Sequence, residues 1–181
     1  MQKKGADWNM KCLLIIDMQN DFLTGTLGTP EGAGIVGNVC SLIRGFDGKV
    51  IYTRDTHGEN YLDTREGQKL PVPHCLQGTE GWQICEEIRR LIRPQDRIVD
   101  KETFGAMDLP EVIESECGGT PEEIHLAGVC TDICVISNAM ICKAAFPETP
   151  VCIHEDCCAG VTPESHTTAL DAMRSCQIDV L

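Results

Sequence analysis

Two cysteines lie four residues apart, Cys130 and Cys134, where a predicted strand passes into a predicted helix. A thiol that loses its proton can act as a nucleophile. Thr131 is a residue type that caps helices through its hydroxyl, which would put Cys134 in the first helical turn. Exposed amides and the helix dipole lower a thiol pKa there, and Cys130 lacks that environment. The local sequence favours Cys134 as the reactive thiol, and a structural role for both stays open.

Other groups with acid–base or metal-ligating chemistry follow the ends of further predicted strands: Asp17, Asp55 with His57, and Asp100 with Lys101. The carboxyl ends of parallel strands meet at one edge of a sheet, and ligands of open α/β folds bind beyond that edge. The sequence therefore predicts a site at which a nucleophile, a base and a cation come together.

Apolar runs and amphipathic segments alternate along the chain, and they define the elements that must position these groups. Short, almost continuously apolar strands are predicted at 12–17, 49–55, 97–100, 123–129, 150–156 and 177–181. Helices are predicted at about 33–45, 80–92, 108–117, 131–146 and 163–175. Such strands are typical of a parallel sheet with helices on both faces. We predict an α/β fold, with one doubly wound, mostly parallel sheet of about six strands in a single domain spanning residues 1–181.

The composition excludes several classes of partner. The net charge is −13, and no lysine- or arginine-rich run is present, so we expect no nucleic acid or membrane partner. The first long apolar run ends at Asp17, and it is too short for the apolar region of a secretory signal or for a membrane span. We expect a cytoplasmic protein that acts on a small molecule. A homo-oligomer is compatible with the sequence, which does not fix the number of copies.

The twelve cysteines do not form a recognisable framework. Disulfide networks stabilise small secreted domains, and zinc ribbons or iron–sulfur clusters use C-x-x-C pairs, which this chain lacks. Cys12, Cys142 and Cys152 lie within apolar runs, where a thiol packs as a small hydrophobe. A non-catalytic thiol or metal-binding protein remains the alternative from another functional class.

Three ordered motifs, "LLIIDMQNDF" (13–22), "DKETFGAM" (100–107) and "GVCTDICV" (128–135), resemble those of the isochorismatase-like cysteine hydrolases, the family that includes nicotinamidases (pyrazinamidases). The resemblance implies a catalytic triad of Asp17, Lys101 and Cys134. Cys134 would attack a carboxamide carbon, Asp17 would carry the thiol proton to the leaving ammonia, and Lys101 would balance their charge. The family also has a cis peptide bond before the residue that matches Cys130. The backbone amides of Cys130 and Cys134 would then form an oxyanion hole.

The same resemblance implies a divalent metal ion. Nicotinamidases hold one through an Asp-x-His and a later His, and this chain reads "DTH" at 55–57 and "PVPHC" at 71–75. The implied ligands are Asp55, His57 and His74, with Glu66 favoured over Glu59 as a fourth. Alternate residues of an extended segment project the same way, so one strand end can present the first two together. Carboxylate and imidazole suit zinc, iron or manganese and do not choose between them.

The activity implied is hydrolysis of nicotinamide to nicotinate and ammonia, a reaction of NAD salvage. A flat substrate needs apolar walls, for which the candidates are Phe22, Tyr61, Phe104 and, less favoured, Trp82. Many nicotinamidases read "DWH" where this chain reads "DTH", and Tyr-Ser-Ala where it reads "FGAM". A relative of nicotinamide therefore stays open as the substrate. So does a ureido or carbamoyl compound of the kind that metal-free amidohydrolases of the family hydrolyse.

Overall fold

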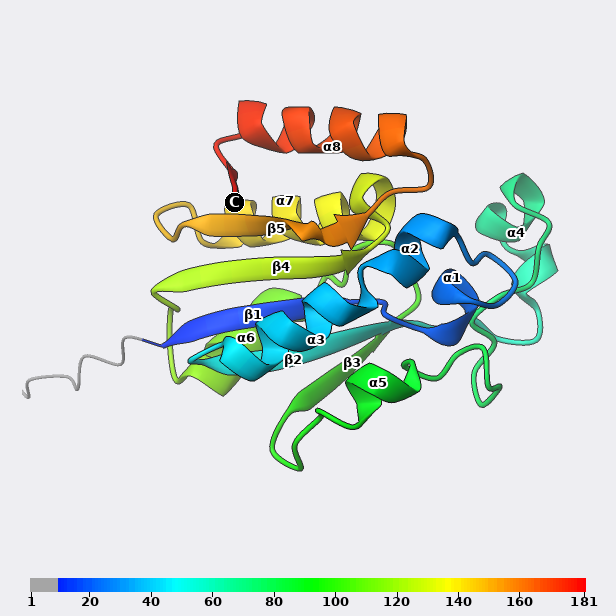
Figure 1. The fold of residues 1–181 in the computed structure, drawn as a ribbon, viewed down its shortest axis with the longest axis horizontal. Coiled ribbons are helices and arrows are strands. Elements are labelled where there is room, and N and C mark those ends of the chain that lie inside the picture. The colour runs from blue at the N-terminus through cyan, green and yellow to red at the C-terminus, as the bar shows by residue number, and fades with distance from the viewer. Residues whose placement is uncertain (1–9) are drawn as a thin grey trace, which may run out of the picture.

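The computed structural model describes residues 10–181. Within them six strands form one sheet in the order β3-β2-β1-β4-β5-β6, and every neighbouring pair is parallel (Figure 1). The strands are β1 (Lys11–Ile16), β2 (Lys49–Asp55), β3 (Arg97–Lys101), β4 (Glu123–Val129), β5 (Val151–Ala159) and β6 (Asp179–Val180). The predicted fold class is therefore confirmed.

Helices connect the strands of this sheet. They are α1 (Asn20–Leu23), α2 (Pro30–Gly34), α3 (Val36–Gly45), α4 (Arg65–Lys69), α5 (Glu86–Arg89), α6 (Leu109–Cys117), α7 (Ile136–Ala145) and α8 (Pro163–Ser175), with a 3₁₀ turn η1 (Tyr61–Asp63) and a π turn η2 (Thr131–Val135). The helices α6, α7 and α8 pack on one face, and α3 and α5 pack on the other. The short helix α4 stands apart, beyond the carboxyl ends of the strands (Figure 1).

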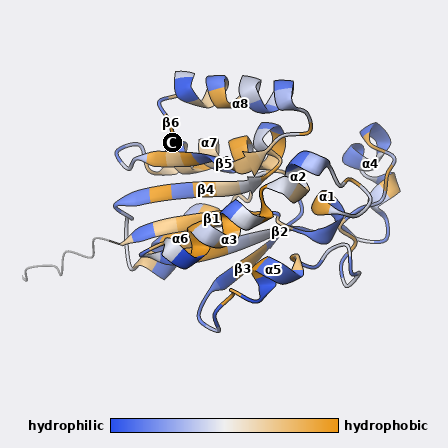
Figure 2. Ribbon diagram, in the orientation of Figure 1, coloured by the Kyte–Doolittle hydropathy of each residue, from blue (hydrophilic) through white to orange (hydrophobic). Residues whose placement is uncertain are grey.

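The core consists of two apolar layers, one on each face of the sheet. In β1, Leu14 and Ile16 belong to one layer, whereas Leu13 and Ile15 belong to the other, and all four are almost completely buried. This is why β1 reads as a continuous apolar run rather than an alternating one. Figure 2 shows β1 as largely hydrophobic and the outer helix α8 as mixed. Among residues 10–181, no helix is both long and apolar enough to cross a membrane.

The sheet reverses its order of connection between β1 and β4, and the two strands approach closely there. Gly128 has a φ of +129°, and a Cβ at this position would lie 2.1 Å from the carbonyl oxygen of Ile16. Only glycine fits such a backbone at that distance. The end of β1, with Asp17, and the end of β4, with Cys130, are therefore neighbours at the place where open α/β folds bind ligands.

Two sequence predictions about elements are wrong. The helix predicted at 80–92 is only the single turn α5, because Ile84 pairs with Gln19 in an isolated β-bridge and Trp82 lies in the preceding loop. The strand predicted at 150–156 does not end there. Its register against β4 shifts between Leu126 and Gly128, so that β5 continues to Ala159, with Glu155 and Asp156 as exposed residues within it.

Candidate active site

Asp17 is held rigidly at the end of β1. Its side chain is completely buried, and its backbone has a φ of +48°, uncommon for a residue other than glycine. The hydroxyl of Thr53, from β2, donates a 2.6 Å hydrogen bond to Oδ1 of Asp17 and accepts one of 3.2 Å from its backbone N–H. The carboxylate is thereby fixed with Oδ2 as its remaining acceptor.

Lys101 joins this carboxylate to the thiol. Its Nζ lies 2.7 Å from Oδ2 of Asp17, 3.1 Å from Oδ1 of Asp55 and 3.5 Å from Sγ of Cys134. Burial alone would lower the pKa of Lys101, but the charges of Asp17, Cys134 and Asp55 raise it above its usual value. The side chain is therefore a protonated, almost completely buried cation. The structure brings Asp17, Lys101 and Cys134 together.

The helix that carries Cys134 begins differently from the prediction. Its first turn is the π turn η2, the N-cap is Cys130, and no side chain caps it. Thr131 does not cap the helix, because its hydroxyl forms a 2.8 Å hydrogen bond with Nδ1 of His166. Asp132 accepts a hydrogen bond from the backbone N–H of Val161. The peptide bond between Val129 and Cys130 is cis, as the family resemblance implies.

The electrostatic environment of Cys134 corrects a second expectation. Burial raises the pKa of its thiol well above the usual value, Asp17 raises it further, and only Lys101 lowers it. The lowering of this pKa predicted for the start of the helix is therefore not found, and the thiol needs a proton acceptor. Oδ2 of Asp17 accepts no well-aligned hydrogen bond from any described residue, although Nζ of Lys101 is 2.7 Å away. Oδ2 of Asp17 is therefore the oxygen available to accept the thiol proton of Cys134.

Four side chains converge on one point beside this group: Asp55, His57, Glu66 and His74, with ligand atoms within 4.8 Å of one another. Nε2 of His57 lies 2.8 Å from Oδ2 of Asp55 and 3.7 Å from Oε1 of Glu66. Nε2 of His74 lies 3.6 Å and 3.8 Å from the same oxygens. Glu59 is exposed and is not part of this cluster.

The donor set fits a divalent metal ion. Nε2 of His57 is buried and makes no well-aligned hydrogen bond with any described residue, despite its short distance to Asp55. Nδ1 of His74 donates to the carbonyl of Val72 at 2.9 Å, which leaves Nε2 as the lone-pair nitrogen that faces the cluster. Although burial alone would raise it, the neighbouring His57, His74 and Lys101 lower the pKa of Asp55, so its carboxylate is ionised.

Tyr61 supports this cluster and does not form a substrate wall. Its ring centroid lies 4.6 Å from that of His57 and 5.0 Å from that of His74, and its hydroxyl donates to the carbonyl of Leu70. The loop that carries His74 is held by Asp21, which accepts a 2.7 Å hydrogen bond from the backbone N–H of Cys75.

A cavity of about 890 Å³ opens over both groups of residues. It is lined by Cys134, by the metal-ligand cluster and by two of the predicted aromatic residues, Phe22 and Phe104. Trp82 does not reach it, because its indole N–H donates to Thr56 and its ring stacks under the guanidinium of Arg54 at 3.6 Å. The side chain of Cys130 also lines the cavity, with burial raising its pKa to about 12.

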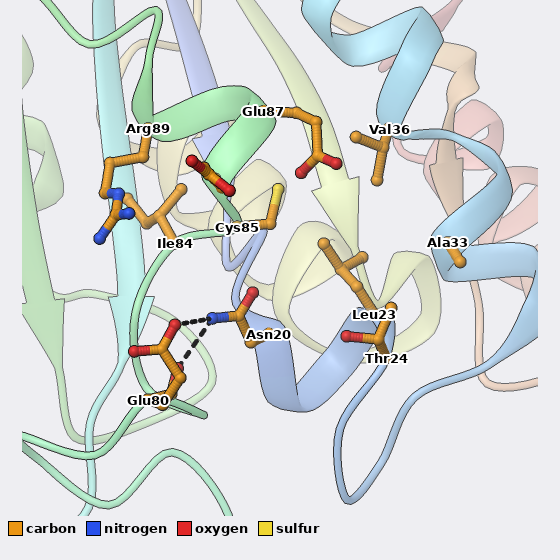
Figure 3. A pocket seen from close by; sticks show the side chains of 11 residues that line it. Asn20, Leu23, Thr24, Ala33, Val36, Glu80, Ile84, Cys85, Glu87 and Arg89 are labelled. Carbon is orange, nitrogen blue, oxygen red and sulfur yellow. Dashed lines mark hydrogen bonds between the residues drawn. The ribbon is translucent and has the colours of Figure 1, made fainter.

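A second cavity, of about 530 Å³, lies between α1, the start of α3 and α5 (Figure 3). Its residues include Asn20, which is hydrogen-bonded to Glu80, and the thiol of Cys85. Burial raises the pKa of Cys85 to about 11, and no histidine or buried cation lies beside it. This cavity lacks the groups that the first one assembles.

Three buried polar residues that position the site were missed by sequence reasoning. Besides Thr53, they are Gln19 and Asn138. Gln19 accepts from the backbone N–H of Asp55 at 2.7 Å and donates to its carbonyl at 2.8 Å. Asn138 donates to the carbonyl of Cys134 and accepts from the N–H of Ala106. Gln19 and Thr53 adjoin other polar residues and give no signal of this role in the sequence, whereas Asn138 lies within a mostly apolar run.

Comparison with known proteins agrees with this geometry. Residues 11–181 match the family model described as "Isochorismatase domain". The chain is 31% identical over 176 residues to an uncharacterized isochorismatase family protein PncA of Bacillus subtilis, with 88% of this chain and 92% of that one covered. It is 26% identical to the nicotinamidase/pyrazinamidase of Mycobacterium tuberculosis, with 95% and 98% covered.

A similar solved structure is the pyrazinamidase of Pyrococcus horikoshii in complex with zinc. It is 29% identical to this chain, with a TM-score of 0.81 and with 94% of this chain and 98% of that one covered.

Proposed function

Because this chain belongs to the isochorismatase family, we propose that it is a metal-dependent cysteine amidohydrolase that converts nicotinamide to nicotinate and ammonia. The observation that carries the proposal is one cavity lined both by Cys134 and by the cluster of four metal-ligand side chains. The thiol of Cys134 also lies 3.5 Å from Nζ of Lys101. The similarity to a nicotinamidase/pyrazinamidase over 95% of this chain supports the same substrate class.

The thiol of Cys134 is the proposed nucleophile. Its raised pKa means that the proton must leave as the sulfur attacks, and Oδ2 of Asp17 is the acceptor with a free lone pair. Sulfur adds to the carboxamide carbon, and the carbonyl oxygen becomes an oxyanion facing the backbone amides of Cys130 and Cys134. Lys101 stays protonated throughout and stabilises the anionic Asp17 and the developing thiolate.

The intermediate then collapses to a thioester. Asp17 returns the proton to the nitrogen, which leaves as ammonia rather than as an amide anion. A water molecule, deprotonated by the same carboxylate, adds to the thioester carbon. The acid is released and Cys134 recovers its proton, so atoms and charges balance over the cycle.

The four-residue cluster of Asp55, His57, Glu66 and His74 is the proposed ligand set for one divalent ion. As a Lewis acid, the ion would hold a ring nitrogen of the substrate and so fix its carboxamide near the thiol. Phe22 and Phe104, which line the cavity, provide apolar contact for the ring. The side-chain amide of Asn138 donates hydrogen bonds to the backbone carbonyls of Phe104 and Cys134, and so fixes the position of the apolar wall relative to the nucleophile.

A coupled ammonia assay on a panel of amides tests this function. The panel contains nicotinamide, pyrazinamide and a ureido compound, each with and without chelator, beside the metal content of the purified protein. We expect ammonia from nicotinamide, loss of activity on chelation and recovery with a divalent ion. Turnover of the ureido compound alone, unchanged by chelation, would instead assign the chain to the metal-free amidohydrolases.

A further inference from the structure

The cavity extends beyond the groups that react. Its volume of about 890 Å³ is near the upper end of the range of roughly 300–1,000 Å³ found for pockets that enclose drug-sized ligands. Cys134 and His74 are nearly buried at its inner part, whereas Arg65 and Lys69 are exposed at its outer part. A single pyridine ring with its carboxamide would occupy only the inner part.

The outer part carries two cations that have no partner. Arg65 and Lys69 are separated by one turn of α4, and both line the cavity. Neither forms an ion pair or a side-chain hydrogen bond with any residue in the range 10–181, although the chain has a net charge of −13. The carboxylate nearest in sequence, Glu66, is turned inward, with Oε1 3.7 Å from Nε2 of His57. These two charges are therefore available to a ligand.

The outer part also exposes apolar surface. Leu70 and Val161 line the cavity and keep 37% and 48% of their surface exposed. Clustered apolar exposure of this kind is a feature of binding surfaces. Glu102 is also a lining residue, on the loop after β3, so an anion is favoured on the α4 side and disfavoured beside that loop.

From these features we infer that the outer cavity is a subsite for the anionic end of a larger substrate, an aromatic carboxamide that also bears a carboxylate. The inference rests on the proposed function, since it assumes that the carboxamide lies at Cys134. The apolar residues cover the body of such a molecule. Arg65 and Lys69 bind its carboxylate, and Arg65 offers the planar fork of donors that matches a carboxylate.

Binding to the metal-loaded Cys134→Ala protein tests the subsite without turnover. Isothermal titration compares nicotinamide with nicotinamides that carry a carboxylate at the end of a short alkyl chain, attached at each free ring position in turn. We expect at least one of these anions to bind about tenfold more tightly than nicotinamide at low salt. The advantage should shrink as salt is added, because exposed charges are screened.

Variants of α4 assign that preference to its residues. In the Cys134→Ala background, Arg65→Ala with Lys69→Ala should remove most of the tenfold ratio between the anionic and the neutral ligand. Gln68→Ala, on the same helix but not lining the cavity, should keep the ratio. If no anionic isomer binds more tightly than nicotinamide, or if the double variant keeps the ratio, the subsite is wrong.

The two proposals fail in different ways. Hydrolysis of nicotinamide by the wild-type protein together with an unchanged ratio in the double variant would overturn the subsite alone. An α4-dependent preference for the anion in a protein that releases no ammonia from nicotinamide would overturn nicotinamide as the substrate and leave the subsite standing.

Discussion

Lys101 contacts carboxylates from two different groups of residues. Its Nζ lies 2.7 Å from Asp17, on the side of the thiol, and 3.1 Å from Asp55, on the side of the metal-ligand cluster. A buried cation between two buried carboxylates reduces the cost of desolvating both. Burial raises the pKa of Asp17, and the charge of Lys101 opposes that rise. The ammonium group of Lys101 therefore stabilises both the proposed base, Asp17, and one proposed metal ligand, Asp55.

The two cysteines of the η2 turn should differ sharply when each is replaced by alanine. Cys134→Ala should abolish ammonia release, because it removes the proposed nucleophile. Cys130→Ala should keep most of the turnover, because only the backbone amide of Cys130 faces the oxyanion. Circular dichroism of both variants checks that the fold is intact. An equal loss in the two variants would contradict this division of roles.

Asp17→Asn should lower kcat by about 10²- to 10⁴-fold, the contribution typical of a positioned acid–base group. An amide can still accept from Thr53 but cannot take the thiol proton, so the loss should persist at every pH between 6 and 9. The measurement is steady-state kinetics with nicotinamide. Asp100→Asn, at an exposed carboxylate on β3, is the matched control and should stay near wild type. Retention of a tenth of the wild-type kcat by Asp17→Asn would make it structural only.

At the scale of elements, the contact between β1 and β4 holds Asp17 beside the η2 turn. Gly128→Ala would place a Cβ 2.1 Å from the carbonyl oxygen of Ile16, in a backbone with φ of +129°. We expect the free energy of unfolding to fall by about 3 kcal/mol or more. Gly34→Ala, where a Cβ meets nothing within 4 Å, should change it by less than about 1 kcal/mol. Urea unfolding of both variants measures this, and equal effects would contradict it.

The pairing of β4 with β5 should make stability depend on pH. Nδ1 of His125 lies 3.0 Å from Nε2 of His154, and burial, followed by the charge of His125, lowers the pKa of His154. Below about pH 6.5, where an unfolded histidine gains its proton, the unfolded state binds more protons than the folded one. The free energy of unfolding should therefore fall as the pH drops from 7 to 5.5.

His154→Gln tests this dependence. In urea unfolding, the variant should lose less stability than the wild-type protein over the same pH interval, whereas His166→Gln should not reduce the loss. A wild-type slope that persists in His154→Gln would assign the effect to other groups.

The sequence predicted the strands and the residues at their ends more accurately than the helices. A strand that is covered on both faces appears in the sequence as a continuous apolar run. Because parallel strands end at the same edge of the sheet, the convergence of Asp17, Lys101 and Cys134 follows from the positions of these residues at strand ends. The helix predicted at 80–92 fails because its periodic residues pack as a loop, in which Trp82 is bonded to Thr56. The role of Thr53 could not be predicted, since it depends on a contact across two strands.

At the scale of the whole molecule, loading with metal should raise thermal stability, because the four ligands come from the end of β2, the segment just after it, α4 and the loop that follows α4. A ligand at 100 times its Kd stabilises the folded state by about 2.7 kcal/mol. For a chain of this size that is a rise in Tm of roughly 5–10 °C. Differential scanning fluorimetry before and after chelation measures it. Glu66→Ala should reduce the shift, Glu59→Ala should not, and no shift in the wild-type protein would contradict the site.

The two outer strands of the sheet limit association between copies of this chain. An open sheet leaves unpaired backbone groups at its edges, where a strand of another molecule can add. At one edge β6 has only two residues, Asp179 and Val180, which offer little template. At the other edge β3 exposes the charged residues Arg97 and Asp100. Both edges therefore offer little template for strand addition, and the repulsion that a net charge of −13 provides acts in the same direction.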